Sequence, residues 1–91
     1  MQVNVNHEEQ TFYQYVLKQM SVADFNTLPQ QLGVSSRMAS LRLKKPEKMP
    51  LGMIQTLAKI LKVSDQYLVD EFQAGYDTLT AGEYKQLIQA D

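Results

Sequence analysis

The chain has 91 residues, of which 44% are hydrophobic, and a formal net charge of −1, so it is long enough for one small domain and too apolar to be disordered. It contains no cysteine, which excludes a disulfide framework and any thiolate metal site and suits the reducing cytoplasm, where we expect the protein to reside. The first six residues lack the basic and apolar runs of a signal peptide, and no stretch approaches the ~20 apolar residues that a membrane span needs.

The first predicted helix begins at Asn6, after an N-terminal arm of residues 1–5. Asn6 is a favourable N-cap, and Glu9, three residues later, completes a capping-box pattern. Phe12, Val16 and Met20 are spaced four residues apart and form one apolar stripe. We therefore expect a helix that ends near Met20.

The second predicted helix is short, from Leu28 to Leu32, because Pro29 would disrupt a helix that began further upstream. With Thr27 as the N-cap, Pro29 falls in the first turn, where its missing N–H costs little. Gly33 follows, and glycine readily adopts the left-handed conformation that closes many helices.

The third predicted helix runs from Ser36 to about Lys44, with Ser35 as its N-cap. Ala39 and Leu43 are four residues apart and should face the interior, while polar and basic residues occupy the other faces.

Three more helices complete the predicted all-α fold. The fourth has the apolar spacing of a buried face. The fifth is capped by Ser64 and ends before Gly75. The last begins at Ala81, after a second capping-box pattern formed by Thr80 and Glu83. The buried face of the fourth comprises Leu51, Ile54, Leu57, Ala58 and Leu61. We assign residues 6–75 to the domain and residues 76–91 to a C-terminal tail.

Positive charge is concentrated in the middle third of the chain. Residues 35–64 contain seven Lys or Arg residues and one Glu, whereas residues 65–91 contain one Lys and six Asp or Glu residues. Such segregation can orient a protein toward a polyanion even when its total charge is near zero, although a solvated helix face without a partner has the same pattern.

Two stretches carry a resemblance to a known family. Leu28-Pro-Gln-Gln-Leu-Gly-Val-Ser35 resembles the turn of the Cro and lambda-repressor type helix-turn-helix family, and Arg42-Leu-Lys-Lys-Pro46 with the apolar pattern from Leu51 to Leu68 resembles its later helices, in a version common in phage-like regulators. The resemblance covers roughly Val22 to Phe72. It implies a compact five-helix lambda-repressor-like DNA-binding domain with a helical C-terminal tail, in a bacterial, cytoplasmic, repressor-like regulator of transcription.

The resemblance also implies the partners and the site. Double-stranded DNA is the expected partner, bound by a homodimer, because one recognition helix reads only a few base pairs. The residues matching base-contacting positions are Ser36, Arg37, Ser40 and Leu41, and those matching phosphate-contacting positions are Ser35, Arg42, Lys44, Lys45 and Lys48. Arg37 is the best candidate for base readout, because a guanidinium can pair bidentately with guanine.

Three positions depart from the residues usual in this family. Pro29 stands where alanine is common, Phe25 replaces a glutamine that often contacts phosphate, and Ala39 replaces a bulkier aliphatic residue. The last of these allows a shifted recognition helix.

Other classes of function remain as alternatives. The same fold can serve as a protein-binding module (an adaptor, an antirepressor or an antitoxin-like protein), and the acidic final third would suit a basic protein partner. Enzyme chemistry has little to work with, since no nucleophile and base or phosphate-cradling glycine loop occurs at a telling spacing, and His7 has no second nitrogen or sulfur ligand to join it. We therefore expect no catalytic residues, no cofactor or metal, no membrane association and no small-molecule ligand.

A dimer contact is expected on the fifth helix and on Tyr76, Leu79, Leu87 and Ile88.

Overall fold

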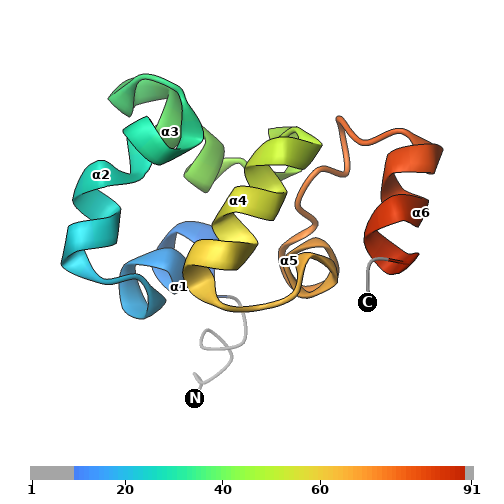
Figure 1. The fold of residues 1–91 in the computed structure, drawn as a ribbon, viewed down its shortest axis with the longest axis horizontal. Helices are drawn as coiled ribbons and strands as arrows, with labels where there is room; N and C mark the ends of the chain where they lie inside the picture. The colour runs from blue at the N-terminus through green and yellow to red at the C-terminus, as the bar shows by residue number, and fades with distance from the viewer. Residues whose placement is uncertain (1–9, 90–91) are drawn as a thin grey trace, which may run out of the picture.

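The computed structural model describes residues 10–89, and over this range the chain consists of helices joined by short connections, with no strand (Figure 1). This confirms the all-α class. In chain order the elements are α1 (Phe12–Gln19), α2 (Val22–Leu32), α3 (Ser36–Lys44), the 3-10 helix η2 (Pro46–Lys48), α4 (Leu51–Leu61), α5 (Asp65–Phe72) and α6 (Ala81–Gln89). None of the helices in this range is long and apolar enough to cross a membrane.

Helix α4 forms the centre of the core. It contacts α2 on one side and α5 on the other, and α5 in turn contacts α6 (Figure 1). Five of its residues are buried, and Ile54 and Leu57 have no exposed surface. Burying a side chain of this size stabilises the fold by about 1.5–3 kcal/mol, so α4 is the main scaffold for the helices around it.

Aromatic side chains join α1 to α5. The Phe72 ring lies 5.2 Å from the Phe12 ring and 5.0 Å from the Tyr15 ring, centroid to centroid, and the Tyr67 ring lies 6.0 Å from that of Tyr15. Burial, followed by the neighbouring Tyr67, raises the pKa of Tyr15 above its ordinary value. Tyr15 is therefore neutral at physiological pH and serves packing.

Helix α1 begins at Phe12 rather than at Asn6, which lies outside the described residues. Its N-cap is Thr11, whose hydroxyl accepts a hydrogen bond from the Gln14 N–H at 3.1 Å, while the Thr11 N–H donates to Gln14 Oε1 at 3.0 Å. The chain thus holds two capping-box patterns five residues apart, and the one nearer the apolar stripe begins this helix.

Helix α2 corrects the expectation of a short helix. It begins at Val22, capped by Ser21, whose hydroxyl accepts from the Asp24 N–H at 3.0 Å, and it continues through Pro29. Pro29 removes one backbone donor at a cost of about 3 kcal/mol. The cap and the burial of Leu28, which is 1% exposed, offset that cost.

Several other helix boundaries are confirmed. Gly33 ends α2 with φ +73°, and α3 covers the predicted range. On α4, four of the five residues predicted to be buried are buried, while Leu51 is half-buried and Met53 is buried in its place. Ser64 caps α5, and Thr80 with Glu83 forms the capping box before α6. The expected dimer contact needs correction, because Leu87 is buried within the single chain and Leu79 packs against the core. The side chain of Ile88 lies outside the described part.

Candidate nucleic-acid interface

A tight turn joins α2 to α3. Gly33 is left-handed, and the N–H of Val34 donates to the Pro29 carbonyl at 3.0 Å, which satisfies a carbonyl at the end of α2. Val34 packs against the core, and the Ser35 hydroxyl then accepts from the Met38 N–H at 3.1 Å and begins α3. The two helices are therefore joined by a short turn with a hydrogen bond at each end.

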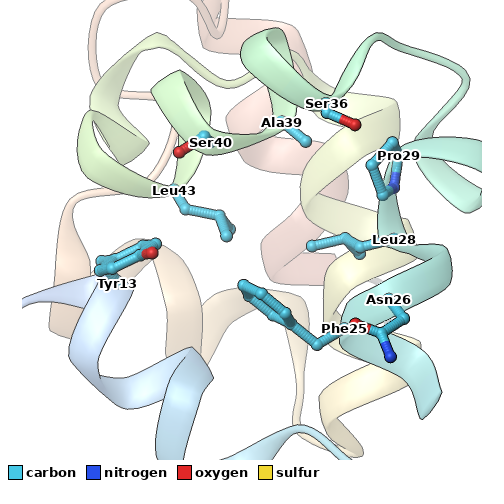
Figure 2. Close-up of a pocket in the computed structure, with 9 residues that line it drawn as sticks. All are labelled: Tyr13, Phe25, Asn26, Leu28, Pro29, Ser36, Ala39, Ser40 and Leu43. Carbon is cyan, nitrogen blue, oxygen red and sulfur yellow. The ribbon is translucent and has the colours of Figure 1, made fainter. Parts of the chain in front are cut away.

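The inner side of α3 rests on α1 and α2. Ala39 and Leu43 are 4% and 2% exposed, as their spacing predicted, and Leu43 points toward Leu28 of α2, with the Phe25 ring beside them (Figure 2). A hollow of about 280 Å³ remains between the three helices, and the small side chain of Ala39 is one of those that line it. The inner side of α3 thus packs on both α1 and α2, with the hollow beside the contact.

The outer side of α3 carries a stripe of three residues one turn apart. Arg37, Leu41 and Lys44 follow i, i+4 and i+7 spacing, and all three are exposed, Leu41 at 42%. Ser36 and Ser40 line the hollow instead, Ser36 exposed and Ser40 half-buried (Figure 2). The structure therefore divides the predicted base-contacting residues between two sides of the helix.

Four of the five predicted phosphate-contacting residues lie in the last turn of α3 or after it. Lys45 is exposed and Arg42 is half-buried. The ammonium of Lys44 lies 5.6 Å from the centre of the Tyr13 ring, a distance at which the ring attracts a cation. Ser35 lies at the opposite end of the helix, so the predicted contacts extend along its whole length.

Lys48 differs from the other cations. Its Nζ lies 3.2 Å from Oδ2 of Asp77, and this is the only ion pair formed among residues 10–89. The two residues are far apart in sequence, so no local pattern pointed to Asp77 or to its contact with the loop.

The described residues offer little other chemistry. They include no group of three His, Cys, Asp or Glu side chains that could hold a metal ion, and His7 lies outside the described range. Burial raises the pKa of the Asp65 carboxyl, while Lys59 acts in the opposite direction, and both lie away from α3, on α5 and α4.

Comparisons with protein-family models, curated proteins and solved structures give no match to this chain. Function is therefore inferred from the chain's own residues.

Proposed function

We propose that the chain is a sequence-specific DNA-binding regulator of transcription, repressor-like, in which α2 and α3 form a helix-turn-helix of the lambda-repressor type and α3 is the recognition helix. The observation that carries the proposal is the outer stripe of Arg37, Leu41 and Lys44, which faces solvent while the opposite side of α3 is buried. One helix fits the major groove, which is ~12 Å wide. The stripe would then meet base edges and backbone together.

Each side chain has a role that its chemistry suits. Arg37 pairs with guanine through two hydrogen bonds, and Leu41 contacts a thymine methyl. The Ser35 hydroxyl oxygen accepts the capping hydrogen bond, which leaves its proton free for a phosphate oxygen. Lys44 and Lys45 supply salt-sensitive affinity that is blind to sequence.

We propose that the protein acts as a homodimer in a bacterial cytoplasm. Two copies of α3 in successive turns of the groove read two half-sites, which gives the specificity that one short helix lacks. Tyr76, 58% exposed, is a residue of the expected dimer contact that has surface left for a second copy.

Binding to duplex DNA separates this proposal from that of a protein-binding module. We expect the chain to bind a random-sequence duplex at low salt and to select a palindromic motif from a random pool. A chain that ignores both would instead fit the module, for which the acidic final third favours a basic protein partner.

Point variants test the surface itself. Arg37→Ala should weaken specific binding by about 1–3 kcal/mol and relax selection at one base position. Lys45→Ala should weaken binding to all sequences alike and reduce the salt slope by about one. Lys59→Ala, which removes an exposed lysine from α4, is the matched control and should leave both quantities unchanged. Wild-type binding by both the Arg37 and the Lys45 variants would reject α3 as the DNA-binding surface.

A further inference from the structure

The segment between α5 and α6 is hydrogen-bonded to the loop that follows α3. The Gly75 N–H donates to the Pro46 carbonyl at 2.8 Å, and the Asp77 N–H donates to the Glu47 carbonyl at 2.9 Å. The Thr78 hydroxyl donates to the carbonyl of Met49, a residue with no exposed surface. Two backbone hydrogen bonds and one from a side-chain hydroxyl hold the two segments in register.

This register places an acidic side chain against a predicted DNA contact. Lys48 and Asp77 form their ion pair at 3.2 Å with about half of each side chain exposed. Because the Asp77 N–H is bonded to the Glu47 carbonyl, the backbone of Asp77 is held next to the loop that carries Lys48, within reach of its ammonium.

We propose that Asp77 competes with DNA phosphate for Lys48 and so holds the affinity of the basic loop below its full value. The inference rests on the proposed function. A phosphate that approaches Lys48 has to displace a carboxylate from it and then lies near a like charge. Phosphate contacts carry no sequence information, so the pair weakens binding to every sequence and leaves more of the discrimination to Arg37.

The expected size of the effect follows from the exposure of the pair. Exposed ion pairs are weak, so removing the carboxylate should tighten binding by only about two- to fivefold. A freed Lys48 that neutralises one phosphate should also steepen the salt dependence by up to about one unit of slope.

The test is a titration of a labelled random-sequence duplex of about two helical turns, over a range of salt concentrations, with the wild-type chain and Asp77→Asn. Asparagine keeps the size of the side chain and the backbone N–H bond to Glu47, and thermal unfolding checks that the fold is retained. Asp70→Asn is the matched control, because it removes an exposed charge from α5 that forms no ion pair within the described residues.

We expect Asp77→Asn to bind more tightly than both the wild type and Asp70→Asn, and this gain to vanish in a Lys48→Ala background, where no ammonium remains to be released. Equal gains from the two asparagine variants, or a gain that persists without Lys48, would overturn the inference and leave the proposed function intact. If the wild-type chain binds no duplex at low salt, the proposed function fails and takes this inference with it.

Discussion

Helices α3 and α4 are close neighbours in the chain but are built in opposite ways. Helix α4 buries five of its eleven residues, and its side chains form the centre of the core. Helix α3 buries only Ala39 and Leu43 of its nine, and it adjoins a hollow that no side chain fills. Helix α4 therefore forms the centre of the core, whereas α3 packs on α1 and α2 with one side and keeps its other side exposed to solvent.

The largest expected effect on stability comes from truncating a leucine to alanine, compared between the two helices. Leu57→Ala on α4 deletes a fully buried side chain and should lower the free energy of unfolding by about 2–5 kcal/mol. Leu41→Ala on α3, where the side chain is 42% exposed, should lower it by less than about 0.5 kcal/mol and should reduce DNA affinity instead. Denaturant unfolding and duplex titration measure the two quantities, and similar losses of stability would break the comparison.

Two left-handed glycines sharpen the contrast. A Cβ at Gly75 would lie 2.7 Å from Cγ of Leu79 and 2.8 Å from Cδ1 of Ile54, whereas one at Gly33, at the entry to α3, would meet nothing within 4 Å. We expect Gly75→Ala to lower the free energy of unfolding by about 2–4 kcal/mol, and Gly33→Ala, with backbone strain alone, by about 1–2 kcal/mol. Equal losses from the two variants would show that side-chain packing around Gly75 contributes nothing.

The smallest effect concerns two serine caps. Ser35 and Ser64 begin α3 and α5 with the same hydrogen bond at 3.1 Å, so either change to alanine should cost about 1 kcal/mol in unfolding. Only Ser35→Ala should also weaken DNA binding, because only Ser35 adjoins the proposed interface. A matching loss of affinity in Ser64→Ala would mean that the effect arises from stability and not from contact.

Where local signals agree, sequence was sufficient to predict the elements. Ser35, Gly33 and the spacing of Ala39 with Leu43 all indicate the same position for α3, and the structure has it there. At Pro29 the signals conflict. The proline argues against a long helix, whereas Ser21 is a favourable N-cap further upstream, and local rules do not say which signal prevails. In the structure the helix begins after Ser21 and continues through Pro29.

The candidate site shows the same limit. Helical spacing predicted which side of α3 would be buried, and the exposed Arg37 and Leu41 follow from it. The pairing of Lys48 with Asp77 could not be predicted, because it depends on how the segment after α5 returns to the loop after α3. Contacts between segments distant in sequence have no local signature.

The position of Tyr13 beneath Lys44 gives the molecule an optical property. The chain has five tyrosines and no tryptophan, so its ultraviolet emission comes from phenol rings alone. Tyr15 is buried where α1 packs against α5, and Tyr67, 40% exposed, lies beside it, whereas Tyr13 has an ammonium group 5.6 Å from the centre of its ring. If the chain binds DNA as proposed, we expect a phosphate to draw this ammonium away and to change the electric field at the Tyr13 ring, so that tyrosine emission changes on binding and Tyr13→Phe reduces that change.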